Sequence, residues 1–267
     1  MSEATPLGED RFVAPPLRFA AFEPRFVAES ALLRLSAPLL RRPAPDPHPV
    51  LVLPGLGATD RSTARLRGVL RQQGHRVHGW GLGRHKVWTR AGVAAVEQRL
   101  ADLHERYGRP VTLVGVSAGG ILARELARAE PATVRQVVTI VSPFRHRSGD
   151  DNRIARVFSR VRPGARDHFQ ELPREDDRPP LLMPVTALYS RTDGFVDWRS
   201  CVETPGPRRD NIEVRTSHLG AASSLGVAIA VSDRLACPLE DWRPFQPPRG
   251  TTVLFPQFRR VRGGPRS

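Results

Sequence analysis

From residue 49 onward the chain alternates between short apolar runs and longer segments in which apolar residues recur at helical spacing. Most of the short runs are rich in Val, Leu or Ile and are followed by turn residues, which predicts buried strands. These runs lie at 50–53, 75–80, 111–116, 134–141, 185–189 and 212–214. The helical segments, the first with Asp60 as its expected N-cap, lie at 61–73, 91–107, 121–129 and 221–235. Strands that alternate with helices predict an α/β fold, with a mostly parallel sheet and helices on both faces.

Composition divides the chain into a Pro-rich N-terminal segment, one domain and a basic tail. The first segment covers 1–48 and contains an expected amphipathic helix at 25–40. Its apolar face is expected to pack on its own domain, and contact with a membrane surface is the alternative. The domain covers 49–245, with an insertion at 142–184 that is either a functional cap or a solvated loop. The tail at 246–267 is rich in Pro, Gly and Arg and is expected to be flexible.

The net charge is +14, from 41 Lys and Arg against 27 Asp and Glu. The basic residues form no stripe with interleaved aromatics and no nucleic-acid motif is present, so no nucleic-acid partner is expected. Charged residues interrupt the first apolar stretch, at 12–40, which therefore predicts neither a secretory signal nor a membrane span. A cytoplasmic protein is expected. Cys201 and Cys237 are too few for a disulfide framework, and separate thiols are favoured over a single pair.

The strongest signal for chemistry is the sequence Gly-Val-Ser-Ala-Gly at 115–119, between a Val-rich strand and a helix. In this context the G-x-S-x-G pattern is typical of a nucleophile elbow, in which the serine stands on a sharp turn. Gly115 and Gly119 leave the space that such a turn requires, and the helix after it directs its N–H groups at the site. The pattern predicts that Ser117 is a nucleophile. A Gly-rich helix start with a capping serine is the alternative.

A serine nucleophile needs a base that takes its proton and a carboxylate that orients the base. Folds with a nucleophile elbow place both on loops after later strands, in the order Ser, acid, His. Three histidines follow Ser117, namely His146, His168 and His218. Only His218 comes after a late strand, in the small-residue turn at 216–220, and it is the predicted base. A surface histidine without a catalytic role is the alternative.

Asp193 is the predicted acid, because it closely follows the strand expected at 185–189 and lies where ligands gather in open α/β sheets. Asp197 is the competing candidate, four residues further along, and is expected instead to cap or brace the turn. The sequence therefore predicts a triad of Ser117, His218 and Asp193.

Acyl transfer also needs N–H donors for the oxyanion of the tetrahedral intermediate. One predicted donor is the N–H of Ala118, directly after the nucleophile. The other is the N–H of Leu56, in the Pro-Gly-Leu-Gly loop at 54–57. A plain strand-to-helix turn is the alternative interpretation of this loop.

Other kinds of site are not expected. His75 and His78 stand at odd spacing on one predicted strand, so their rings would point to opposite faces and a shared metal is not expected. Gly81 and Gly83 lack the third glycine and the later acidic partner of a dinucleotide-binding fingerprint. The sequence predicts no metal and no cofactor.

These motifs together resemble the bacterial lipase/esterase-like branch of the α/β-hydrolase superfamily. The matching pieces lie at 52–55, 60–63, 79–83, 115–120, 142–143, 190–194 and 217–220. The resemblance implies an α/β-hydrolase fold and an acyl-enzyme mechanism, with Ser117 as nucleophile, His218 as general base and then acid, and Asp193 as the orienting carboxylate. Many such lipases carry His-Gly in the oxyanion loop where this chain has Pro54-Gly55. His85 fits no role in this pattern.

The predicted activity is hydrolysis of a small-molecule carboxylic ester or a lipid through an acyl-enzyme. An acyltransferase with the same triad is one alternative, because the residues do not distinguish water from another acyl acceptor. A non-catalytic binding protein on the same fold is a second alternative, which the complete set of candidate residues disfavours. The residue pattern carries no signal for the oligomeric state.

Overall fold

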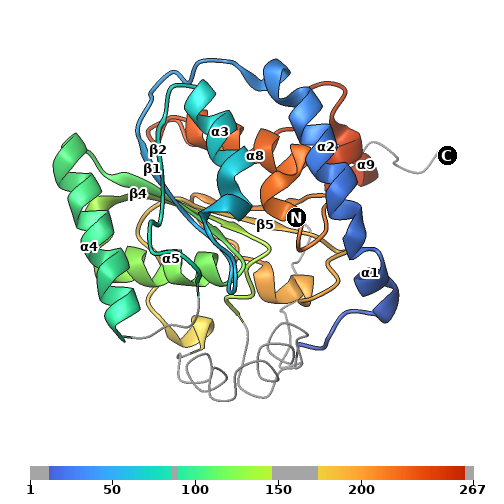
Figure 1. Cartoon of the computed structure of the whole chain (residues 1–267), viewed down its shortest axis with the longest axis horizontal. Helices are drawn as coiled ribbons and strands as arrows, with labels where there is room; N and C mark the ends of the chain where they lie inside the picture. Colours follow the sequence, from blue (N-terminus) through green and yellow to red (C-terminus); the bar gives the residue numbers. More distant parts are fainter. Residues whose placement is uncertain (1–11, 86–89, 146–173, 262–267) are drawn as a thin grey trace.

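A parallel sheet runs through the centre of the molecule (Figure 1). The computed structural model describes residues 12–85, 90–145 and 174–261. In chain order the strands are β1 (Pro49–Leu53), β2 (Arg76–Gly79), β3 (Val111–Val116), β4 (Val134–Ile140), β5 (Val185–Tyr189) and β6 (Arg209–Glu213). They lie in the order β2-β1-β3-β4-β5-β6, and each neighbouring pair is parallel. The predicted α/β class with a parallel sheet is confirmed.

The last strand, β6, differs most from its predicted position. It begins at Arg209, before the apolar run predicted at 212–214, and ends at Glu213. Only its last two residues are buried, because β6 is the edge strand and pairs on one side only. An edge strand accommodates polar side chains, so an apolar pattern does not mark its start.

Helices cover both faces of the sheet, as predicted (Figure 1). One face carries α2 (Phe26–Ser36), α3 (Ala64–Gln72) and α8 (Leu225–Ala236), and the other carries α4 (Arg90–Tyr107) and α5 (Ala118–Ala129). Strand side chains alternate between these faces. Val50 and Val52 belong to the core with α3 and α8, whereas Leu51 and Leu53 belong to the core with α4 and α5. Full burial of each such side chain contributes roughly 1.5–3 kcal/mol relative to an exposed position.

Short 3-10 segments connect several of these elements. They are η1 (Glu23–Arg25), η2 (Ala37–Leu40), η3 (Asp60–Thr63), η4 (Pro131–Thr133), η5 (Glu175–Asp177), η6 (Trp198–Cys201), η7 (Ala221–Ser223) and η8 (Thr252–Leu254). The predicted helix at 61–73 begins as η3, and its N-cap is Thr59 rather than Asp60. The Asp60 carboxylate instead accepts hydrogen bonds from the N–H groups of Trp80 (3.0 Å) and Gly81 (3.1 Å). Asp60 therefore joins the loop after β1 to the end of β2.

The N-terminal segment forms α1 (Leu17–Ala21), η1, α2 and η2 along one side of the molecule (Figure 1). The predicted amphipathic helix at 25–40 is present as α2 followed by η2. Leu33 is buried in the core that α8 shares, whereas Leu35 and Leu39 are 78% and 81% exposed. The face that packs on the domain is therefore narrower than predicted. Within the described ranges, no helix combines the length and apolar character needed to cross a bilayer.

The C-terminal segment packs on the domain over residues 252–261, through η8 and α9 (Pro256–Val261). Phe255 is fully buried, with its ring 4.8 Å from that of Phe245. The carbonyl oxygen of Leu254 accepts a hydrogen bond from the N–H of Arg215 (2.9 Å), just after β6. Burial of Phe255 favours this position of the segment, and the flexibility expected of the tail at 246–267 stays a prediction.

Most of the predicted insertion, residues 146–173, lies outside the described residues, and its role as a cap stays a prediction. Both ends of the insertion are attached to the domain. The N–H of Arg145 donates to the carbonyl oxygen of Ser200 (3.0 Å), and Glu175 forms an ion pair with Arg124 of α5. Arg124 is itself 2% exposed and also pairs with Glu203 (2.6 Å).

Both cysteines are free and buried, as separate thiols were predicted to be. Cys201 lies at the end of η6, close to the loop after β5. Burial raises the pKa of the Cys201 thiol well above its ordinary value, and the negative charge of Asp193 raises it further. A thiol in this environment stays protonated and unreactive at neutral pH.

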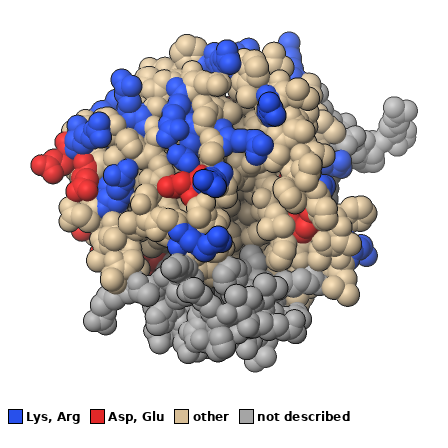
Figure 2. Space-filling model, viewed as in Figure 1, with Lys and Arg blue, Asp and Glu red and all other residues tan. Residues whose placement is uncertain are grey.

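The positive charge is carried by separate side chains on several elements. Figure 2 shows Lys and Arg spread over one face of the molecule, with uncharged surface between them. Exposed arginines on and beside α3 include Arg61, Arg65, Arg71 and Arg76. At physiological ionic strength such exposed charges are screened beyond about 8 Å.

Candidate active site

Ser117 stands in the turn between β3 and α5. Its φ of 52° and ψ of −123° lie in a region that costs a non-glycine residue roughly 1–3 kcal/mol. A Cβ on Gly115 would collide with the backbone of Gly119, and one on Gly119 would lie 2.6 Å from the carbonyl oxygen of Pro54. The glycines therefore leave the space that this strained turn needs at the carboxyl edge of the sheet.

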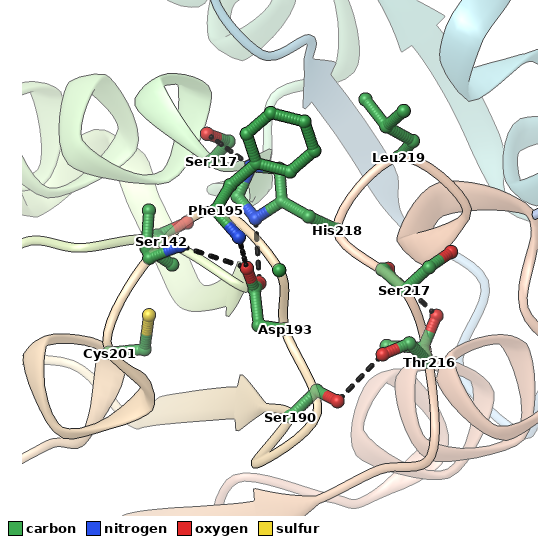
Figure 3. A network of polar contacts seen from close by, with 12 residues as sticks. Ser117, Ser142, Ser190, Asp193, Phe195, Cys201, Thr216, Ser217, His218 and Leu219 are labelled. Carbon is green, nitrogen blue, oxygen red and sulfur yellow. Dashed lines mark hydrogen bonds and ion pairs between the residues drawn. The ribbon is translucent and has the colours of Figure 1, made fainter. Parts of the chain in front are cut away.

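The structure brings Ser117, His218 and Asp193 together, from the loops after β3, β6 and β5 (Figure 3). The Nε2 of His218 lies 3.1 Å from the Oγ of Ser117, and its Nδ1 lies 2.6 Å from the Oδ2 of Asp193. All three side chains are buried. An imidazole between a hydroxyl and a carboxylate has the geometry of a Ser-His-Asp triad. The other two histidines that follow Ser117, His146 and His168, lie outside the described residues.

The second carboxylate oxygen of Asp193 fixes the orientation of this side chain. Oδ1 accepts hydrogen bonds from the N–H groups of Phe195 (2.7 Å) and Val196 (2.9 Å), so that Oδ2 is left to face the imidazole (Figure 3). The competing carboxylate, Asp197, accepts from the N–H of Arg199 (3.0 Å) and caps η6. The structure thus places Asp193 against His218 and gives Asp197 the capping role expected of it.

The surroundings of His218 change its affinity for a proton. Burial by itself lowers the pKa of the imidazole, but the charge and hydrogen bond of Asp193, together with the charge of Glu23, outweigh it. The pKa of His218 is therefore held above its ordinary value of 6.5. A raised pKa strengthens an imidazole as a proton acceptor and confines its neutral form to higher pH.

The oxyanion hole was predicted to consist of two backbone N–H groups, those of Ala118 and Leu56. Ala118 opens α5, so its N–H is one of the groups that have no partner within the helix. Leu56 follows Gly55, which lies against Ser117: a Cβ on Gly55 would be 3.3 Å from the Cβ of Ser117. In the described ranges no acceptor takes the N–H of Leu56 or Ala118. Neither N–H is used by the fold in the described ranges, as the predicted role requires, and that role stays a prediction.

A sequence model of the alpha/beta hydrolase family matches residues 50–257 of the chain, a range that includes Ser117, Asp193 and His218. The chain belongs to the α/β hydrolase family. No curated protein sequence matches it.

Three solved structures that resemble the chain in fold share 13–16% of its sequence over the aligned part. A monoacylglycerol lipase from Paleococcus ferrophilus is 16% identical, with a TM-score of 0.51, over 73% of this chain and 95% of its own. The pyrethroid hydrolase PytH is 16% identical, with a TM-score of 0.53, over 71% of this chain and 98% of its own. An N-formylmaleamic acid deformylase from Pseudomonas putida S16 is 13% identical, with a TM-score of 0.50, over 72% and 92%. At such identities the likeness shows the fold alone.

His85 acquires a role in this α/β hydrolase that its sequence context does not indicate. Its buried imidazole contacts the carbonyl oxygen of Pro54 through Nδ1 (2.8 Å). Its backbone pairs with the same loop, accepting from the N–H of Gly57 (2.6 Å) and donating to the carbonyl oxygen of Ala58 (2.8 Å). Burial lowers the pKa of His85, which keeps the ring neutral near pH 7. His85 therefore holds the loop that carries Leu56.

Replacing His85 by alanine is expected to lower kcat by about 10-fold or more, with a small change in KM, because a displaced oxyanion donor weakens transition-state binding more than substrate binding. His85→Asn places an amide N–H close to the position of Nδ1 and is expected to restore most of the rate. Steady-state kinetics of both variants on one ester checks this. Equal losses in the two variants, or a loss confined to KM, would contradict the assignment.

His75 and His78, which were not expected to share a metal, have separate hydrogen-bond partners. The Nδ1 of His75 accepts from the N–H of His48 (3.3 Å), whereas the Nε2 of His78 contacts the hydroxyl of Tyr107 (2.9 Å). His75 precedes β2 and His78 lies within it. Over the described ranges, no group of three or more His, Cys, Asp or Glu side chains has the arrangement of a metal site.

Two carboxylates that contact the loops of Asp193 and His218, those of Glu23 and Glu29, were not predicted from the sequence. Their hydrogen bonds to the loops after β5 and β6 join residues 171 to 196 positions apart. No spacing rule connects residues so distant, and in sequence both glutamates only interrupt an apolar stretch. The other charged residues at 12–40 are all Arg, and the sequence around the two glutamates offers no signal of a buried carboxylate.

Proposed function

We propose that the protein is a serine hydrolase that cleaves carboxylic esters through an acyl-enzyme formed on Ser117. The observation that carries the proposal is the hydrogen-bonded array from Ser117 Oγ through His218 to Asp193, with contacts of 3.1 and 2.6 Å. The solved structures with this fold include a protein named as a monoacylglycerol lipase, which supports an ester substrate. The substrate class is a small-molecule ester or lipid with an acyl chain.

In the acylation step, the Oγ of Ser117 attacks the ester carbonyl carbon while its proton passes to the Nε2 of His218. The carbonyl oxygen becomes an oxyanion, which the N–H groups of Leu56 and Ala118 stabilise; loss of one such donor typically costs about 10²–10³ in kcat. The imidazolium then donates its proton to the alcohol oxygen as the C–O bond of the ester breaks. Alcohol leaves, and the acyl group remains on Ser117.

Deacylation repeats these roles with water in place of Ser117. His218 takes a proton from water, the resulting hydroxide attacks the acyl carbon, and the same two N–H groups hold the second oxyanion. Collapse of this intermediate returns the proton to Ser117 Oγ and releases the carboxylic acid. Asp193 stays ionised throughout and stabilises the imidazolium in both halves of the reaction.

The test combines a fluorophosphonate probe with a series of p-nitrophenyl esters of increasing acyl length, using the wild-type protein. Covalent labelling that mass spectrometry maps to the peptide with Ser117, together with turnover of at least one ester, is the expected result. Folded protein that neither reacts with the probe nor turns over any ester would contradict the proposal and favour the non-catalytic binding protein.

The same experiment distinguishes a hydrolase from an acyltransferase. The acyl-enzyme partitions between water and any alcohol that reaches it, so the products are measured with and without an added alcohol such as glycerol. A hydrolase gives mainly the free acid under both conditions. Predominant transfer to an alcohol at millimolar concentration would show that the protein is an acyltransferase. The roles of Ser117, His218 and Asp193 would be unchanged.

A further inference from the structure

The buried carboxylate of Glu23 contacts both loops that carry the partners of Ser117. We call residues 190–196, after β5, the acid loop, and residues 214–220, after β6, the histidine loop. Glu23 Oε1 accepts hydrogen bonds from the N–H of Gly194 in the acid loop (2.9 Å) and from the N–H of His218 in the histidine loop (3.0 Å). Its Oε2 accepts from the N–H of Leu219 (3.0 Å). One side chain from η1 therefore joins the two loops.

Two further side chains of the N-terminal segment make parallel contacts. The guanidinium of Arg25 donates to the carbonyl oxygens of Thr192 (2.9 Å) and Thr216 (2.8 Å), one in each loop. Glu29, in α2, accepts from the N–H (2.8 Å) and the hydroxyl (2.7 Å) of Ser217. Arg25 and Glu29 are themselves paired at 3.2 Å. Glu23, Arg25 and Glu29 form what we call the N-terminal brace.

Each loop has a glycine where the N-terminal segment approaches it. A Cβ on Gly194 would lie 2.8 Å from the Cα of Ala20 and from the carbonyl oxygen of Phe19. A Cβ on Gly220 would collide with the carboxylate of Glu29. Gly194 follows Asp193 directly, and Gly220 comes two residues after His218. These glycines therefore let α1 approach the acid loop closely and let Glu29 approach the histidine loop closely.

Burial of an ionised carboxylate is unfavourable unless hydrogen bonds replace its water. Glu23 is 3% exposed, and no Lys or Arg pairs with it within the described ranges. Backbone N–H groups of the two loops replace its water instead, and hydrogen bonds to an ionised acceptor are stronger than neutral ones. The cost of removing this carboxylate from water is therefore offset only when the acid loop and the histidine loop both donate their N–H groups to it.

We propose that Glu23 is a positioning residue, which sets the separation of the acid loop and the histidine loop so that His218 reaches Asp193 and Ser117 together. The role rests on the proposed function of that array. The N-terminal segment, which lies outside the sheet and contributes no member of the array, is then a working part of the active site.

The charged groups around His218 predict a distinctive pH effect. Asp193 faces its ring, Glu23 faces its backbone, and Arg25 and Glu29 contact the two residues before it. Because the negative charge of Glu23 helps to raise the pKa of His218, Glu23→Gln is expected to lower that pKa. A general base works when neutral, so the acidic limb of the kcat/KM profile is expected to move to lower pH.

The experiment compares wild type, Glu23→Gln and Glu23→Ala in two measurements. The first is kcat/KM against pH, with rates divided by the concentration of sites that a fluorophosphonate titrates. The second is the pKa of the His218 ring, from NMR titration of protein with isotope-labelled histidine. We expect Glu23→Ala to lower kcat per titrated site by about 10-fold or more, and Glu23→Gln to shift both the pH limb and the NMR titration to lower pH.

Asp210→Asn is the matched control. Asp210 is also a partly buried acid that accepts a backbone hydrogen bond, from the N–H of Phe245 (2.6 Å), but it lies in β6 away from the array. It is expected to lower thermal stability without moving the pH limb or the titration of His218. An unchanged His218 titration and unchanged kcat per site in Glu23→Gln would overturn the proposal.

The NMR titration does not depend on catalysis. An inactive wild type would therefore contradict the proposed function, and the effect of Glu23 on His218 would still be measured from the titration of the ring. If the Glu23 variants do not fold, Glu29→Gln replaces them. Its loss of kcat per titrated site, with KM little changed, is the expected result. Full activity per site in Glu29→Gln would overturn the role of the brace.

Discussion

Replacing Ser117 by alanine is expected to lower ester turnover by about 10⁴-fold or more and to abolish fluorophosphonate labelling. The members of a triad act as a unit, so removal of the nucleophile leaves only the contribution of the oxyanion donors and of substrate binding. Alanine keeps the Cβ and therefore the strain at φ 52°, and within the described residues the only side-chain hydrogen bond it removes is the one to His218, so thermal stability is expected to change little. Turnover, labelling and thermal unfolding of the same preparation check the three effects.

Ser142 offers a matched control for this variant. It is a second buried serine near the elbow, and its hydroxyl donates to the carbonyl oxygen of Ile140 (3.1 Å) rather than to a histidine. Ser142→Ala is expected to keep labelling and turnover within a few-fold of wild type. Labelling that persists in Ser117→Ala and disappears in Ser142→Ala would show that Ser142, and not Ser117, is the nucleophile.

Replacing Asp193 by asparagine is expected to lower kcat by about 10³–10⁴-fold with little change in the fold. The amide oxygen of asparagine can keep the two bonds from the N–H groups of Phe195 and Val196. Its NH₂ group then faces the Nδ1 of His218, which must act as acceptor, and the ring proton moves to Nε2. A protonated Nε2 cannot take the proton of Ser117, so the imidazole is present but in the wrong tautomer.

Asp197→Asn tests whether this loss is specific. Asp197 caps η6 through the N–H of Arg199, and an amide oxygen accepts that bond as well. Activity close to wild type is expected from this variant, measured on the same ester at the pH optimum of the wild type. A larger loss of activity in Asp197→Asn than in Asp193→Asn would show that Asp197, and not Asp193, is the carboxylate that orients His218.

The sheet was predictable because the central strands are short and mostly apolar. A central parallel strand is buried on both faces, so β1, β3 and β5 show no polar alternation, and β4 has its two long polar side chains, Arg135 and Gln136, only near its start. The start of the polar edge strand β6 was placed wrongly, and the buried position of Phe255 was not predicted, for the opposite reason. Their positions depend on one or two buried side chains in polar surroundings, which no window average detects.

The array was predictable where it depends on local sequence and missed where it depends on distant contacts. The turn at Ser117 needs glycines at fixed offsets, and Asp193 and His218 each follow a strand, so position along the chain indicates position at the sheet edge. Glu23 and His85 act through hydrogen bonds to loops that are distant in sequence and that the fold brings to them. Nothing in the residues around them distinguishes such a side chain from one that faces solvent.

The contact between Glu23 and His218 joins residues 195 positions apart, and this separation bears on when the protein becomes active. Contacts between distant residues form late, because the intervening chain must first be ordered. During synthesis the segment with Glu23 leaves the ribosome long before the histidine loop exists, and Ser117 waits without its base. Under the proposed function, activity requires synthesis through the histidine loop, so a nascent chain that ends before residue 214 would carry Ser117 without its base and would not hydrolyse esters.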